Sequence, residues 1–319
     1  MKKRSPIWFA LLMLFAMSLW GFSWTNAKIV GQYTSVPIII FWRFLLGWLA
    51  MGPLLYFLRI PLLPPRKSLC FIVAGGFCII CYNILFLLGT RTGLAGAGGI
   101  LVTTLNPLFT FFYSFLLFRV FIQKKDILGL FLGFIGGSIM LEIWHISGEQ
   151  LLKSGNVYFL LASSTWAFVT IISSRSKDVI HPLTFSFWIY LTASLITIPV
   201  AVLEPVANIF SFDMTFWIHL AFLSLGALAV GTSIFFIGAT HLGSGKASAF
   251  IFTVPITAMG FSMIFLGEQL TPNVVIGGIF TMTAVYLISV RQTSSLDKPS
   301  RDHGPAANPV PFENNPPAQ

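Results

Sequence analysis

The distribution of Lys and Arg along this chain constrains its fold more than any other feature. Ten apolar stretches of about 20 residues lie between Ile7 and Val290, and most basic residues fall in alternate gaps between them. If the amino terminus is cytoplasmic, fifteen of the nineteen basic residues lie on the inside. The outside gaps hold Lys28, Arg91 and Lys153, and Arg43 is the one basic residue that we place within a span. This asymmetry predicts a multi-pass membrane protein with both termini cytoplasmic.

Composition supports the same class. The chain is 56% hydrophobic and 9% charged, against about 25% charged residues in a typical soluble domain. Each stretch is long enough for a helix to cross a hydrocarbon core of about 30 Å. The net charge of +9 is spread over short loops rather than gathered in a patch, so we expect no nucleic-acid partner. We expect an integral protein of a bacterial plasma (inner) membrane.

The predicted fold class is an all-α polytopic membrane protein with ten transmembrane helices. The predicted spans are 7–26, 37–58, 68–89, 96–118, 127–144, 155–174, 183–203, 216–238, 247–266 and 273–290. The remainder, 291–319, holds six prolines among small and polar residues, which predicts a disordered cytoplasmic tail.

An internal repeat relates the two halves of the chain. Trp20 recurs as Trp166, 146 positions later, and Pro107 recurs as Pro255, 148 positions later. Similar offsets relate Phe41 and Trp42 to Phe187 and Trp188, the Asn83 to Gly89 segment to the Thr232 to Gly238 segment, and Gly129 to Gly277. We therefore predict a first five-helix unit at 7–144 and a second at 155–290. Because five is odd, the second unit is inverted, an architecture typical of secondary transporters with a substrate site near the bilayer midplane.

Polar and aromatic side chains within the spans are the candidate substrate-pathway residues. A buried cation is costly in lipid, so Arg43 either reaches the surface and backbone carbonyls or contacts an anionic or carboxylate-bearing substrate. Indoles and amides need hydrogen-bond partners that lipid lacks. The candidates are Trp20, Trp24, Arg43, Asn83, Asn106 and Trp166. Trp20 and Trp24 are four residues apart and are expected to share one helix face.

Two prolines are candidate hinges. Pro107 and Pro255 interrupt equivalent spans, and each removes a backbone hydrogen bond; a static packing kink is the alternative reading. The glycines at 129, 133 and 137 predict close helix packing, within or between protomers. Oligomeric state is left open.

Enzymatic and cofactor-binding patterns are missing from the sequence. There is no H-E-x-x-H, G-x-S-x-G or Walker A motif, so we expect no enzyme, no catalytic residue and no cofactor. Cys78 and Cys81 match C-x-x-C, but no second Cys pair accompanies them, so we expect no metal site. No Asp or Glu occupies the middle of a predicted span, which weighs against proton coupling and metal-cation transport.

Taken together, these residues resemble the EamA-type transporters of the drug/metabolite transporter superfamily. The resemblance covers residues 7–290 and rests on Leu19 to Phe22, Arg43, Asn106 to Leu108, Trp166 with Ala167, Pro255, and Leu266 to Glu268. It implies two inverted five-helix repeats and export of small metabolites such as amino acids or toxic compounds.

The chain departs from the family pattern at two positions. Val120 stands where a glutamate equivalent to Glu268 is expected, and Ile189 pairs with Arg43. We predict a secondary transporter that moves an amino acid or amphipathic compound, with efflux as the expected direction. A lipid-handling or scaffolding membrane protein is the alternative, and an intramembrane enzyme would need paired catalytic groups at one depth.

Overall fold

The computed structural model describes residues 6–118, 124–141, 144, 155–203, 206–242 and 250–296. All regular secondary structure in these ranges is helical. The longer helices are α1 (Pro6–Val30), α2 (Val36–Phe57), α3 (Leu69–Thr92), α4 (Ala95–Phe118), α5 (Lys124–Leu141), α7 (Asn156–Ser176), α8 (Pro182–Val202) and α13 (Pro272–Leu296). The shorter ones are η1 (Arg66–Ser68), η2 (Val206–Ser211), α9 (Met214–Ala221), η3 (Phe222–Gly231), α10 (Thr232–Leu242), η4 (Ile251–Thr253) and α12 (Val254–Leu266).

Seven helical stretches in the described residues are long and apolar enough to cross a membrane. They are Ile7–Val30, Val36–Phe57, Arg66–Thr92, Ala95–Phe118, Asn156–Ser176, Pro182–Val202 and Met214–Gly238. Three shorter apolar helices, Ile127–Ile139, Val254–Leu266 and Pro272–Ala284, coincide with the other expected spans, the last of them beginning one residue earlier than expected. Because helices satisfy their own backbone groups, this all-helical arrangement suits an apolar surrounding.

Several predicted bounds were wrong. α1 continues past residue 26 to Val30, and α3 continues to Thr92. Lys28 and Arg91 therefore lie in the last turns of helices, so Arg43 is not the single basic residue within a helical stretch of this kind. α13 continues to Leu296, which removes the first residues from the predicted tail; residues 297–319 lie outside the described part. The apolar pattern of a sequence locates a span, but it does not fix the residues at which the helix begins and ends.

The eighth predicted span is divided into three helical segments. α9 begins after Asp213, whose side chain accepts a hydrogen bond from the Phe216 N–H, as expected for an N-cap. It continues as the π-helix η3 and then as α10. A π-helix of ten residues is unusual, because wide turns normally occur singly, often near functional sites.

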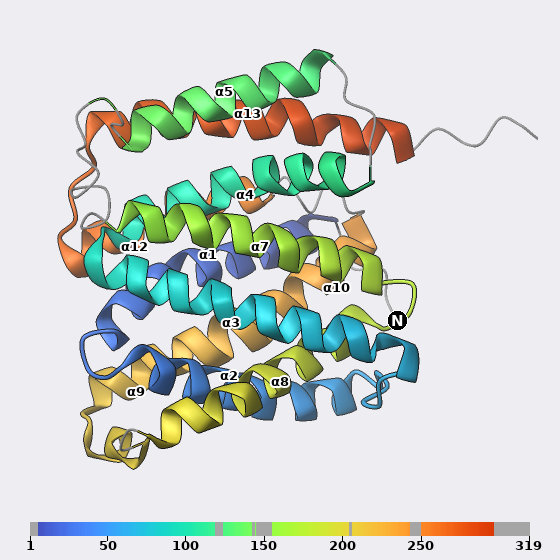
Figure 1. Ribbon diagram of the computed structural model, residues 1–319, viewed down its shortest axis with the longest axis vertical. Coiled ribbons are helices and arrows are strands. Elements are labelled where there is room, and N and C mark those ends of the chain that lie inside the picture. The colour runs from blue at the N-terminus through green and yellow to red at the C-terminus, as the bar shows by residue number, and fades with distance from the viewer. Residues whose placement is uncertain are drawn as a thin grey trace, which may run out of the picture.

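The helices lie side by side in one bundle, with their axes running across the view in Figure 1. α1 begins and α13 ends on the right, which we call the proximal end. The opposite end, where α1 ends and α2 begins, is called the distal end. α5 and α13 form the outermost layer at the top, and α2, α8 and α9 lie at the bottom.

The helix pairs are related by exchange of the two halves. α5 packs against α13 and α2 against α8, and each of these pairs joins equivalent helices of the two units. α3 packs against α7, just as α1 packs against the α9, η3 and α10 segments. Likewise, the contact between α4 and α7 is equivalent in the repeat to the contact between α12 and α1.

Glycines allow the closest of these crossings. A Cβ on Gly89 or Gly98 would lie 2.6 Å from atoms of the Phe159 ring, so the fully buried Phe159 fills a space that only glycine leaves. In α5, Gly133 and Gly137 pack against Leu108 and Leu105 of α4. The glycine spacing in α5 thus serves packing within the chain, as small residues do in membrane bundles.

Candidate functional site

Arg43 lies at the centre of the candidate site. It is in α2, seven residues from the distal start of that helix, and only 5% of it is exposed. Its Nη1 donates a hydrogen bond of 2.6 Å to Oδ1 of Asn83 in α3. Asn83 is held in turn, because its Nδ2 donates to the Ile79 carbonyl at 2.8 Å. The guanidinium is therefore fixed by a second side chain rather than turned toward the surface.

An aromatic face replaces a carboxylate as the second partner of Arg43. The guanidinium carbon lies 5.3 Å from the centroid of the Phe86 ring, within the range of a cation–π contact. The salt bridge between Lys28 and Glu268 does not involve Arg43. The positive charge of Arg43 is thus buried with an amide oxygen and a ring face, and with no acidic partner in the described part.

Two of the predicted tryptophans meet this centre through aromatic contacts. Trp24 of α1 packs edge-on against Phe86, with ring centroids 4.6 Å apart. Trp166 of α7 contacts Tyr82 of α3 at 4.5 Å, and Tyr82 stacks on Phe86 at 5.7 Å. Trp24, Arg43, Asn83 and Trp166 therefore belong to one cluster, which we call the Arg43 cluster, with Phe86 and Tyr82 between them. Phe86 was not among the predicted site residues, although it lies in the repeated segment that begins at Asn83.

Trp20 contacts different elements from Trp24, although the two residues lie one helical turn apart in α1. Its Nε1 donates to the Ala227 carbonyl in η3 at 3.1 Å, and its ring lies 5.2 Å from Phe235 of α10. α1 is packed on both sides, and the long side chains at positions 20 and 24 turn toward different neighbours. Gly231, which corresponds to Tyr82 in the repeat, lies against Trp20, and Tyr82 contacts Trp166, so Trp20 and Trp166 occupy comparable places in opposite halves.

Asn106 and the two prolines are outside the Arg43 cluster. The Asn106 Oδ1 accepts a hydrogen bond of 3.0 Å from Thr110 within α4. Pro107 lies inside α4, as expected. Pro255 does not interrupt a regular α-helix: it lies in the first turn of α12, directly after the 3-10 turn η4. A first-turn proline loses no helical hydrogen bond, so the two prolines are not equivalent in their local structure.

The distal end is closed by a network around Glu268. The Lys28 Nζ lies 2.8 Å from Glu268 Oε1 and donates to the Gly93 carbonyl at 3.0 Å. The backbone N–H groups of Ala95 and Gly96, at the start of α4, donate to the two Glu268 oxygens at 2.8 Å each. Burial opposes ionisation of Glu268, but these donors hold its pKa below the usual value. One carboxylate thus joins α1, α4 and the end of α12.

Further distal contacts join the two halves. The Tyr33 hydroxyl donates to Asp213 at 3.0 Å, and this hydrogen bond raises the pKa of Tyr33. Asn26 of α1 pairs with His219 of α9, and Trp42 of α2 packs edge-on against Phe210, with ring centroids 5.6 Å apart. None of these pairs was predicted, because each one joins residues far apart in sequence.

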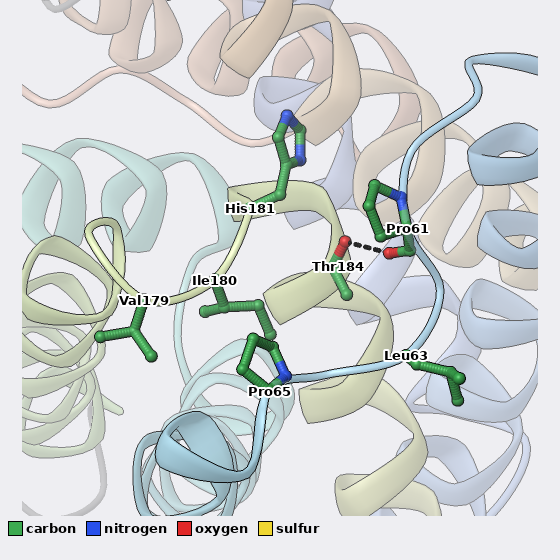
Figure 2. A pocket seen from close by; sticks show the side chains of 7 residues that line it. All are labelled: Pro61, Leu63, Pro65, Val179, Ile180, His181 and Thr184. Atoms are coloured by element: carbon green, nitrogen blue, oxygen red, sulfur yellow. Dashed lines mark hydrogen bonds between the residues drawn. The ribbon is translucent and has the colours of Figure 1, made fainter.

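The proximal end holds a comparable set of contacts. Trp188, the repeat equivalent of Trp42, donates to the Leu62 carbonyl at 2.7 Å, and Leu62 corresponds to Phe210 at an offset of 148. Thr184 donates to the Pro61 carbonyl at 2.7 Å, as Figure 2 shows.

A pocket of about 210 Å³ lies beside this proximal hydrogen bond. It is lined by Pro61, Leu63, Pro65, Val179, Ile180, His181 and Thr184. Val179 corresponds to Tyr33 in the repeat, so a smaller side chain lines this pocket than the one at the equivalent distal position. The pocket contains none of the predicted site residues.

The described residues contain no candidate metal centre. Within the described ranges, no group of three His, Cys, Asp or Glu could hold a metal ion, and Cys70, Cys78 and Cys81 are free thiols. The Arg43 cluster contains one fixed cation, one amide and several aromatic rings. Such groups can bind and orient a small solute by charge, hydrogen bonds and stacking.

Comparison with known proteins finds similarity to transporters. A model of the "EamA-like transporter family" matches residues 7–141 and again 153–290. "Uncharacterized transporter sll0355" of Synechocystis is 30% identical over 220 residues, 63% of this chain and 65% of that protein, so the chain spans just under two thirds of it. "Uncharacterized transporter YyaM" of Bacillus subtilis is 27% identical over 87% of this chain and 92% of its own length.

One relative has a more specific name. The "Probable amino-acid metabolite efflux pump" of Salmonella typhimurium is 24% identical over 86% of this chain and 93% of its own length. A solved crystal structure has a TM-score of 0.63 with 14% identity, and the match covers 92% of this chain and all of the other. This structural likeness shows a shared fold.

Proposed function

Because the chain belongs to the EamA-like transporter family, which its match over residues 7–141 and 153–290 shows, we propose that it is a secondary transporter for a small metabolite. The proposed cargo is an amino acid or an amphipathic compound, and the proposed direction is efflux. The name of the Salmonella relative supports this direction. The protein is an integral membrane protein, and both termini are proposed to be cytoplasmic, with the distal end outside.

The proposed mechanism is alternating access by two inverted five-helix repeats, 7–144 and 155–290. The observation that carries it is the pair of equivalent contacts at opposite ends of the bundle: Trp42 with Phe210, and Trp188 with Leu62. Each contact joins a helix of one half to a connecting segment of the other: Phe210 lies in η2, and Leu62 lies between α2 and η1. If the two halves exchange conformations, one set opens while the other closes, which is how inverted repeats expose a central site to either side.

The proposed substrate pathway runs between the halves. Trp24, Arg43, Asn83 and Trp166 line it in the Arg43 cluster, Trp20 lines it where α1 meets η3 and α10, and Asn106 lines it along α4. Pro107 is the proposed hinge within α4, and Pro255 the proposed hinge where η4 meets α12. The close packing of Trp24, which is only 3% exposed, means that the cluster must loosen before it can take a solute.

That close packing is also the observation that favours the second candidate, a lipid-handling or scaffolding protein without a solute pathway. Transport separates the two. The purified protein in liposomes should exchange at least one of radiolabelled leucine, phenylalanine, threonine or ethidium by counterflow, above the rate of empty liposomes. No exchange of any of these solutes would favour the second candidate.

Variants then test the pathway. Trp20→Ala and Asn83→Ala should each reduce counterflow about tenfold or more, because Trp20 is proposed to line the pathway and Asn83 holds the Arg43 guanidinium in place. Phe15→Ala is the control, since Phe15 lies on α1 but is 52% exposed. If both pathway variants exchange solute as fast as the control, the assignment of these residues is wrong.

A further inference from the structure

Five buried side-chain atoms in the described residues have no hydrogen-bond partner. They are the Arg43 Nε, the Thr25 and Ser224 hydroxyls, the Ser35 hydroxyl and the Trp48 Nε1. A buried polar group without a partner is costly, and in a native structure it calls for an explanation such as a missing ligand. The first three belong to α2, α1 and η3, respectively.

Arg43, Thr25 and Ser224 lie on three neighbouring elements. η3 packs against both α1, which holds Thr25, and α2, which holds Arg43. Gly47, one helical turn after Arg43, faces Ser224: a Cβ on Gly47 would lie 3.7 Å from the Ser224 carbonyl oxygen. Trp24, next to Thr25, contacts the same Phe86 ring that lies beneath the Arg43 guanidinium.

All three residues are buried, and part of the hydrogen-bonding capacity of Arg43 is unused. Thr25 and Ser224 are fully buried, and Arg43 is 95% buried. Asn83 uses one end of the guanidinium, at Nη1, and leaves the Nε edge free. An arginine can offer two parallel N–H groups to one carboxylate. Asn83 thus acts as a positioning residue that keeps one edge of Arg43 available.

The charge balance points to the kind of ligand. The two carboxylates whose contacts are described, Glu268 and Asp213, lie at the distal end and are engaged by Lys28 and by Tyr33. The buried Arg43 has no such partner within the described residues. A ligand that carries one negative charge and several acceptor atoms would satisfy the guanidinium and the two hydroxyls together.

We propose that Arg43, Thr25 and Ser224 form a carboxylate-binding site between α1, α2 and η3, which selects substrates that carry a carboxylate. This proposal rests on the proposed transport function and narrows its substrate class. The π-helical turn at η3 places Ser224 at the contact with α2, and widened helical turns of this kind are frequent at binding sites. The aromatic rings of Trp24, Phe86 and Tyr82 would enclose the apolar part of the same substrate.

The test compares acids with their amides. Counterflow in proteoliposomes is measured with radiolabelled phenylalanine and leucine, each in competition with excess unlabelled amino acid or the corresponding amide. The wild-type protein should be inhibited by the acids at concentrations at least about tenfold lower than by the amides, because a hydrogen-bonded charge pair is lost with the amide. Arg43→Gln should abolish this preference, and Arg43→Lys should retain part of it.

The hydroxyl variants and a matched control complete the test. Thr25→Val and Ser224→Ala should each raise the concentration of acid needed for half-maximal exchange by about threefold to tenfold, since each removes one hydrogen bond to the anion. Trp48→Phe is the control: it removes another buried donor without a partner, but Trp48 packs against Phe187 of α8. It should leave the preference for acids unchanged.

The outcomes are distinct. Equal inhibition of the wild-type protein by acids and amides, with exchange still present, would overturn the carboxylate site and leave transport standing. A preference for acids that survives Arg43→Gln would do the same. If neither these solutes nor ethidium exchange at all, both proposals fail. Because Arg43→Gln could unfold the protein, its elution as a single species in size-exclusion chromatography is checked, and the two hydroxyl variants test the site independently.

Discussion

Glu268 lies 2.8 Å from Lys28, and this ion pair connects the two halves of the chain at the distal end of the bundle. Lys28 belongs to α1, and Glu268 follows α12, 240 positions later. The same carboxylate accepts hydrogen bonds from the first two residues of α4. Val120, the repeat equivalent of Glu268, has no side-chain charge, so the other half cannot form a matching ion pair. Among the described residues, the distal end contains this ion pair, and the proximal end contains the hydrogen bonds of Trp188 and Thr184 to backbone carbonyls.

Glu268→Gln should destabilise the protein. The amide keeps one acceptor but loses the charge, and its nitrogen cannot accept from a backbone N–H. Hydrogen bonds to charged groups contribute about 1.5–3 kcal/mol, and we expect a loss of about 2 kcal/mol in the free energy of unfolding in detergent. Asp178→Asn is the control, because Asp178 is exposed at the proximal end; an equal loss in both variants would show that the Glu268 network contributes nothing special.

The same network should make stability depend on pH. The folded-state pKa of Glu268 lies below its ordinary value of 4.5. Its contribution is therefore fully present above pH 4.5 and is lost as the pH falls through the lower folded-state pKa. The difference in melting temperature between the wild-type protein and Glu268→Gln should be constant from pH 7 to about pH 5 and should shrink below pH 4.5. A difference that is unchanged in acid would contradict this assignment.

Gly98→Ala tests the close crossing of α4 and α7. The added methyl group would lie 2.6 Å from an atom of the Phe159 ring, which is fully buried and cannot move freely. Overpacking of this kind typically lowers stability by about 1–3 kcal/mol. Gly260→Ala is the matched control, because no atom lies within 4 Å of its added methyl group. It should be neutral or slightly stabilising, and a similar loss in both variants would argue against the packing explanation.

Pro107→Ala and Pro255→Ala should differ in effect. Pro107 lies inside α4, so alanine restores a helical hydrogen bond and should stiffen the helix. Pro255 lies in the first turn of α12, where alanine restores none. We expect Pro107→Ala to raise the melting temperature and slow counterflow about tenfold, as loss of a hinge residue would, and Pro255→Ala to change both less. Faster exchange by Pro107→Ala would contradict a hinge at this position.

The proposed topology can be tested by cysteine labelling. Gln32 and Lys177 are exposed at the distal and proximal ends. In a background without the three native cysteines, Gln32→Cys and Lys177→Cys should react with a membrane-impermeant maleimide from opposite sides of the membrane. Gln32→Cys should react from outside in intact cells, and Lys177→Cys only after the membrane is opened. Labelling of both from one side would undo the assignment of an inverted repeat.

Family membership and the positions of the helices could be predicted from the sequence. Ten apolar stretches, a biased distribution of Lys and Arg, and a repeat offset near 147 residues each depend on local composition and order. The choice of Arg43 as a candidate site residue followed from the same reasoning, because a cation within an apolar stretch is conspicuous in the sequence. The helix ends were predicted less well, since α1 and α3 continue beyond their predicted ends. Their last turns contain Lys28 and Arg91, which the charge pattern placed outside the spans. Partners in other elements satisfy both charges.

The tertiary structure alone decided which side chains meet. Trp20 and Trp24 are four residues apart in one helix, yet one donates to η3 and the other contacts Phe86 in α3. Asn83 was predicted as a lining residue, but its contact with Arg43 makes it the group that orients the cation. Glu268 reaches α4 across more than half of the chain. The sequence by itself determined which segments are apolar enough to lie in a membrane, since hydrophobicity is a local property. Packing decided the neighbours, because they depend on how distant helices cross.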